Sequence, residues 1–189
     1  QRQQQYHNTS GLDRQTFADL IARYYGYTSL IDDQIGRIVA ALAAAGHLDD
    51  TLIVYSADHG DGLGSFHMWD KGFGMYDFLY LIPMIFSHPS IKPAVNESFM
   101  SLLDFAPTFL DAAGLAVPDG LDGTSLMPIL TGRSPAVHDG WFIAEHYGQV
   151  IPFWQFMVRN RDAKYVYNPM DRDEFYDLAA DPHETRNII

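Results

Sequence analysis

The chain has 189 residues, of which 47% are hydrophobic and 14% aromatic, so it is long and apolar enough to bury a hydrophobic core. Its 12 basic and 24 acidic residues give a formal net charge of −12, which argues against nucleic acid or an anionic membrane as a partner. Cysteine is absent, which excludes disulfides and thiolate metal sites, and no apolar run approaches the ~20 residues of a membrane span.

The first part of the sequence predicts a polar lead-in and one long helix. Residues 1–12 are polar and aperiodic, so we expect an exposed segment with little order. The chain starts at Gln1 without an initiator Met or an apolar leader, which indicates a processed product or a fragment. From Asp13 to Ala45 the pattern is helical, and Gly46 is a natural stop. The apolar stripe of this helix consists of Ile31, Ile35, Ile38 and Leu42.

Two short apolar runs then predict buried strands. They are Thr51–Ala57 and Ile82–Ser87, and a glycine-rich loop separates them. A further helical stretch runs from Ser101 to Gly114. The succession of helix, strand, loop, strand and helix is typical of an α/β domain.

After Pro118 the pattern changes to shorter elements. Residues 120–132 predict a turn and a small helix, and four runs then predict the strands of an antiparallel sheet. These runs are residues 141–147, 153–159, 164–167 and 174–178. We therefore expect a lead-in over residues 1–12, an α/β part over 13–118 and a small antiparallel-sheet subdomain over 119–189.

The candidate metal ligands are Asp58 and His59, which directly follow the first predicted strand. Ligand sites of open α/β sheets lie at the carboxyl ends of strands. A carboxylate oxygen beside an imidazole nitrogen can supply two ligands to a divalent cation, and Gly60 lets the backbone turn sharply behind them. For these two residues alone, an ordinary polar turn from strand to loop is an alternative of equal weight.

The glycine-rich loop supplies two further candidates. It carries His67, Trp69 and Lys71 among flexible backbone, a mixture typical of ligand-binding loops. Because the net charge is strongly negative, an anionic substrate needs local positive charge, and Lys71 is the candidate that supplies it. His67 is a candidate substrate contact. The alternatives are a solvated surface lysine and a partly buried, hydrogen-bonded histidine.

Four ordered blocks of the sequence carry a resemblance to the sulfatase family. Residues 57–83, ADHGDGLGSFHMWDKGFGMYDFLYLIP, resemble the family segment in which an Asp and an Asn or His bind the metal and a following Lys contacts the sulfate. The other blocks are the approach YYGYTSLIDDQIGRIVAALAAAGHLDDTLIVYSADHG, the pair LLDFAPTFLDAAGL and LDGTSLMPILTG, and the tail EFYDLAADPHETRNI. Leu81 departs from the family pattern, since many members carry Arg there.

The resemblance implies the carboxy-terminal portion of an alkaline-phosphatase-like fold: part of an α/β sheet domain with helices, then a small antiparallel subdomain. It implies Asp58 and His59 as metal ligands and Lys71 as the catalytic contact to the sulfate of a small-molecule sulfate ester. The expected cofactor is a divalent metal, Ca²⁺ because of the oxygen-rich ligation, with Mn²⁺ as the alternative. The compartment is not indicated.

The family's nucleophile is a formylglycine, made from Cys or Ser in a Cys/Ser-x-Pro-x-Arg motif of the amino-terminal part. This chain has no Cys, and Ser87, Ser90 and Ser134 do not fit the motif. We therefore expect it to supply half of the active site of a sulfuric ester hydrolase and to be inactive alone.

Its expected partner is an amino-terminal piece or a second copy of itself. Two alternatives stay open: a phosphonate monoester or phosphodiester hydrolase of the same superfamily, and a non-catalytic sulfatase-derived fragment. Either way, a chain without the preceding strands should expose a bare sheet edge and an apolar face.

Overall fold

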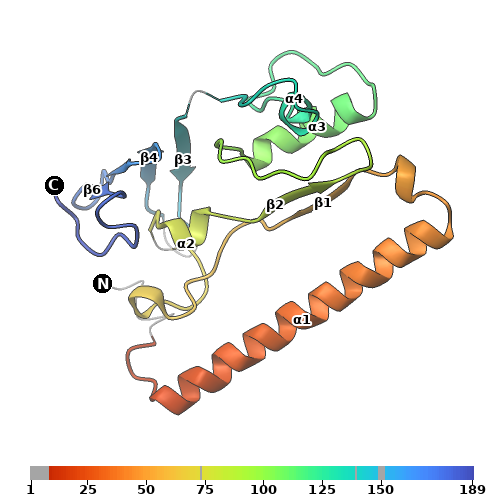
Figure 1. Ribbon diagram of the computed structural model, residues 1–189. Coiled ribbons are helices and arrows are strands. Elements are labelled where there is room, and N and C mark those ends of the chain that lie inside the picture. The colour runs from red at the N-terminus through yellow and green to blue at the C-terminus, as the bar shows by residue number, and fades with distance from the viewer. Residues whose placement is uncertain (1–8, 73, 139, 149–151) are drawn as a thin grey trace. The chain divides into compact units, whose positions relative to one another are not determined.

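The computed structural model describes residues 9–72, 74–138, 140–148 and 152–189 (Figure 1). Contacts within the chain divide it into two compact units, which are described separately. The first comprises the described residues of Gln1–Phe73 with Leu81–Pro89, and the second those of Gly74–Tyr80 with Ser90–Ile189. The boundaries expected after residues 12 and 118 stay a prediction, and residues 1–8 of the expected lead-in lie outside the described residues.

Helix α1 (Arg14–Ala44) dominates the first unit and confirms the predicted helix to within one residue at each end. It begins where the Asp13 carboxylate accepts a hydrogen bond of 2.7 Å from the Thr16 N–H, a typical N-cap. None of its side chains is buried: Ile31 is 49% and Ile38 61% exposed. The apolar stripe is therefore present but only partly covered, since Ile35 and Leu42 are half-buried. Among the described residues, no helix is both long enough and apolar enough to span a membrane.

The two predicted strands are present as β1 (Ile53–Ser56) and β2 (Met84–Ser87), which pair antiparallel as a two-stranded sheet. A short helix, η2 (Leu48–Asp50), precedes β1. The expectation that these strands are buried is wrong for this chain, since Tyr55 is 37% and Ile85 56% exposed. The physical reason is that an isolated pair of strands cannot cover its own faces.

The second unit contains the antiparallel sheet predicted from the sequence. Its strands are β3 (Phe142–His146), β4 (Gln155–Arg159), β5 (Ala163–Tyr167) and β6 (Glu174–Asp177), in the order β3-β4-β5-β6. Alternate residues face the core, where Met157 and Val166 pack against Met75. Met75 precedes a short helix, α2 (Asp77–Tyr80), which the sequence analysis had placed within a loop.

The predicted helix over residues 101–114 is a one-turn helix η4 (Leu102–Asp104) continued by α3 (Phe105–Ala112), and α4 (Met127–Leu130) is the predicted small helix. Buried hydrogen bonds hold these elements together. The Asp104 carboxylate accepts from the N–H groups of Ser101 and Thr124, each at 2.8 Å, and lies 2.9 Å from His138 Nε2. Asp104 therefore joins α3 to the loop before α4.

Thr108→Val tests this buried network. Thr108 Oγ1 donates to the Asp104 carbonyl and accepts from the Leu126 N–H at 2.8 Å, with no exposure to solvent. The isosteric change leaves the buried Leu126 N–H without its acceptor, so we expect the free energy of unfolding to fall by about 1–3 kcal/mol in urea denaturation. In the control, Thr131→Val, the lost hydroxyl is exposed, and the expected change is ~0.5 kcal/mol or less. Equal losses would contradict the role of the network.

Candidate functional site

Three of the four side chains proposed from the sequence come together just beyond the end of β1. His59 Nε2 lies 2.6 Å from Lys71 Nζ and 3.4 Å from Asp58 Oδ2. His59 Nδ1 lies 2.8 Å from the Gly60 carbonyl, which can only accept a hydrogen bond, so Nδ1 carries the proton and Nε2 accepts from the ammonium. A carboxylate, a neutral imidazole and a cation therefore share one place.

The donor set of Asp58 and His59 fits half of a metal site. One carboxylate oxygen and one imidazole nitrogen are suitable ligands for a divalent cation, and the imidazole nitrogen already lies against the positive charge of Lys71. Among the described residues, no group of three or more His, Cys, Asp or Glu side chains could hold a metal ion. An ion at Asp58 and His59 would need its remaining ligands from elsewhere.

Asp61, which the sequence analysis did not single out, braces the loop that carries Lys71. Its Oδ1 accepts from the Leu63 N–H at 2.8 Å and from the Asp70 N–H at 3.2 Å. The Gly62 N–H donates to the Asp70 carbonyl at 2.9 Å. The loop is thus closed at its base, immediately before Lys71. The available sequence signal was the Asp at the start of a turn, whose side chain bonds the backbone two residues on.

The same loop holds an unusual share of strained backbone. Of the five described non-glycine residues with positive φ, four lie here: Leu63 (44°), Phe66 (50°), His67 (60°) and Asp70 (70°). Residues in this conformation cost of order 1–3 kcal/mol each and cluster at functional sites and ligand clamps. The strain indicates that the loop is held in a specific shape by its surroundings.

His67 is not brought to the other three side chains. It ends the one-turn helix η3 (Ser65–His67), its carbonyl accepts from the Thr9 N–H at 2.8 Å, and its side chain is exposed. No contact described in this structure links its imidazole to His59 or Lys71. Its role as a substrate contact stays a prediction without a geometric argument.

Gly64→Ala tests whether the shape of the loop depends on its close packing against Phe17 of α1. Phe17 packs edge-on against Trp69 at 6.4 Å between ring centroids. A Cβ on Gly64, whose φ is +92°, would come within 2.2 Å of the Phe17 ring. We expect a loss of about 1–3 kcal/mol in the free energy of unfolding, measured by tryptophan fluorescence in urea.

The matched control is Gly36→Ala, in the interior of α1, where a Cβ meets nothing within 4 Å. It should stabilise the chain by about 0.5–1 kcal/mol, because alanine loses less backbone entropy in a helix. Stabilisation by both substitutions would show that the loop is not seated on Phe17.

The chain is similar to known sulfatases along most of its length. The family model "Sulfatase" matches residues 1–115, and the model "N-sulphoglucosamine sulphohydrolase, C-terminal" matches residues 64–189. Two curated relatives are an N-acetylglucosamine-6-O-sulfatase of Bacteroides thetaiotaomicron, 38% identical over 88% of this chain, and an arylsulfatase K of Xenopus laevis, 32% identical over 95%. The chain spans only 31% and 35% of their respective lengths.

Solved structures match the fold as well. A phosphonate monoester hydrolase from Silicibacter pomeroyi superposes with a TM-score of 0.85 and 32% identity, over 94% of this chain and 38% of that one. Together with the sulfatase structures that match, it confirms the predicted fold class, an α/β portion with a small antiparallel subdomain.

Proposed function

Because this chain belongs to the sulfatase family, we propose that it supplies half of the active site of a sulfuric ester hydrolase and has no turnover by itself. The observation that carries the proposal is the meeting of Asp58, His59 and Lys71 at the end of β1. The substrate would be a small-molecule sulfate ester. The relatives' names point to sulfated sugars and aryl sulfates as the first classes to assay.

The proposed roles follow from the chemistry of each side chain. Asp58 and His59 would bind a divalent cation, Ca²⁺ or alternatively Mn²⁺, which as a Lewis acid would polarise the ester oxygens. Lys71 would donate hydrogen bonds to sulfate oxygens as negative charge develops on them. The Nδ1–H bond to the Gly60 carbonyl fixes the orientation of the imidazole and leaves Nε2, which lies 2.6 Å from Lys71 Nζ in this structure, as the nitrogen that would bind the cation. The nucleophile, a formylglycine in the family, would come from a part that precedes this chain.

The rest of the site needs a partner, which we propose to be an amino-terminal piece of the same fold, with self-association as the alternative. The exposed apolar residues of α1, β1 and β2 supply the apolar area that such an association would bury.

A phosphorus ester is the second candidate substrate, and the similarity to a phosphonate monoester hydrolase favours it. Both reactions place negative charge on oxygens that a cation and Lys71 would stabilise.

Lys71→Ala tests the proposed catalytic contact. The variant is made in the full-length native protein. We expect its kcat/KM for 4-nitrophenyl sulfate to fall about 10²–10³-fold, because this is the usual cost of removing one charge-stabilising donor. The control is Lys92→Ala, which removes an exposed lysine outside the loop and should leave kcat/KM unchanged. Equal activity of the two variants would remove Lys71 from the mechanism.

The isolated 189-residue chain should show no hydrolysis of 4-nitrophenyl sulfate with Ca²⁺ or Mn²⁺ present, because two ligands and a lysine do not replace a nucleophile. Robust hydrolysis by the purified chain would refute this.

Assays of the native protein with 4-nitrophenyl phosphate and a phenylphosphonate monoester separate the sulfate ester from the phosphorus ester as the substrate. Faster turnover of the phosphorus esters would favour the phosphorus ester.

A further inference from the structure

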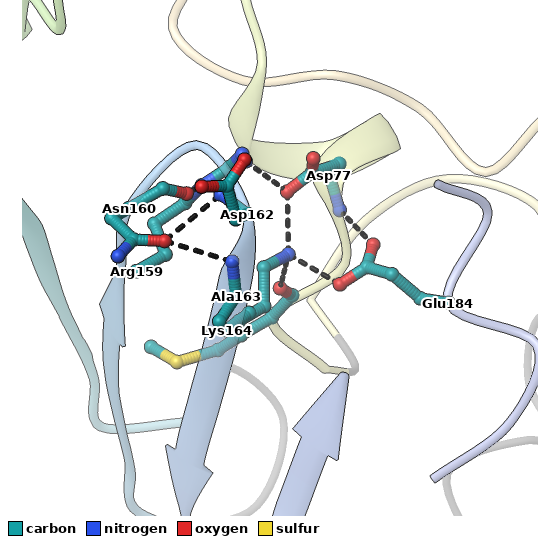
Figure 2. A network of polar contacts seen from close by, with 8 residues as sticks. Asp77, Arg159, Asn160, Asp162, Ala163, Lys164 and Glu184 are labelled. Carbon is teal, nitrogen blue, oxygen red and sulfur yellow. Dashed lines mark hydrogen bonds and ion pairs between the residues drawn. The ribbon is translucent and has the colours of Figure 1, made fainter. Parts of the chain in front are cut away.

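A cluster of four charged side chains lies largely buried within the second unit (Figure 2). Lys164 Nζ donates to Asp77 Oδ1 at 2.5 Å and to the Met75 carbonyl at 2.9 Å, and forms an ion pair with Glu184. Arg159 Nη1 also lies 2.5 Å from Asp77 Oδ1. The cluster joins β4 and β5 to the segment 74–80 and to the carboxyl-terminal tail.

Lys164 is fully buried and meets only oxygen partners. Its ammonium donates hydrogen bonds to the Met75 carbonyl and to Asp77 Oδ1 and forms an ion pair with Glu184, while its side chain has no solvent exposure. The two positive and two negative side chains balance one another. Such a cluster tolerates loss of one member badly, because the remaining charges stay buried without compensation.

The charged cluster holds segment 74–80 against the small sheet. Asp77 is held through its carboxylate by Lys164 and Arg159, and through its backbone N–H by Glu184 Oε2 at 2.6 Å. Met75, two residues earlier, contributes its carbonyl to Lys164 and its side chain to the sheet core. The segment is therefore fixed to the small sheet by charge, backbone and apolar contacts at once.

Lys71 stands between two anchors along the chain. On its amino-terminal side, Asp70 is tied to Asp61 and Gly62 at the base of the loop. On its carboxyl-terminal side, segment 74–80 begins only three residues later. A displacement of this segment would reach Lys71 through very little intervening chain.

We propose that Lys164 is a positioning residue for Lys71: by holding segment 74–80 on the small sheet, it fixes the carboxyl-terminal end of the loop on which Lys71 lies. The inference rests on the proposed function for its kinetic consequence, but not for the anchoring itself.

The test is Lys164→Met in the native protein, with Glu184→Gln as a milder second variant should the first not fold. We expect kcat/KM for 4-nitrophenyl sulfate to fall about 10–100-fold, because a shift of about 1 Å in a charge-stabilising group costs up to 10²-fold. Glu184→Gln should give a smaller loss in the same direction.

Two comparisons separate positioning from mere destabilisation. Thr108→Val weakens the same unit without touching segment 74–80, so at temperatures where it is folded it should keep the wild-type kcat/KM. In a double-mutant cycle, Lys164→Met should add no loss on top of Lys71→Ala, since it acts through Lys71. Additive losses, or an equal loss in Thr108→Val, would overturn the proposal.

Amide hydrogen exchange gives a readout that does not depend on turnover. In Lys164→Met, amides of residues 60–72 should exchange at least tenfold faster than in the wild type, while those of α3 should not change; ~1.4 kcal/mol of local opening corresponds to that factor. Unchanged exchange in the loop would overturn the anchoring. A wild-type protein without sulfatase turnover would instead refute the proposed function and leave the exchange result to decide on the anchor.

Discussion

A buried ammonium must be compensated, and the second unit is organised around that requirement at Lys164. Removing a charge from water costs several kcal/mol, which only well-placed partners offset. Its polar partners are the backbone carbonyl of Met75 and the carboxylates of Asp77 and Glu184, which lie at least 20 positions from Lys164 in the sequence. The electrostatic constraint therefore selects which remote segments pack on the sheet. Apolar contacts alone, being non-directional, would leave that choice open.

The loop that carries Lys71, which precedes segment 74–80, shows the opposite arrangement. It has few buried side chains and much strained backbone, and it keeps its shape through short-range devices: the Asp61 carboxylate, the closure of Gly62 on Asp70, and the seat of Gly64 against Phe17. A loop held in this way can present Lys71 to His59 before any substrate arrives. Preorganisation of this kind is what makes a charged donor effective, since no reorganisation is needed when charge develops.

The sequence predicted most elements of the fold because their signals are local. The helical pattern from Asp13 and the stop at Gly46 bounded α1, and the short runs after Pro118 predicted the strands of the small sheet. It also selected the residues that meet beyond β1, whose roles stay predictions. The Lys164 cluster could not be found in this way, because Asp77 and Lys164 are 87 positions apart and a single lysine in a strand usually indicates a solvated side chain. For the same reason α2 was predicted as loop.

Two features of the first unit are independent of each other. Asp58 and His59 offer only two of the ligands that the proposed cation would need, and apolar residues along α1 and in the β1-β2 sheet are exposed. Under the proposed function, a single amino-terminal partner would account for both features, because its strands would cover the apolar residues and carry the remaining ligands. Self-association would bury apolar area equally well but would bring only a second copy of the same two ligands. The chemistry of the site therefore favours an amino-terminal partner over a homo-oligomer, although the apolar surface alone does not distinguish them.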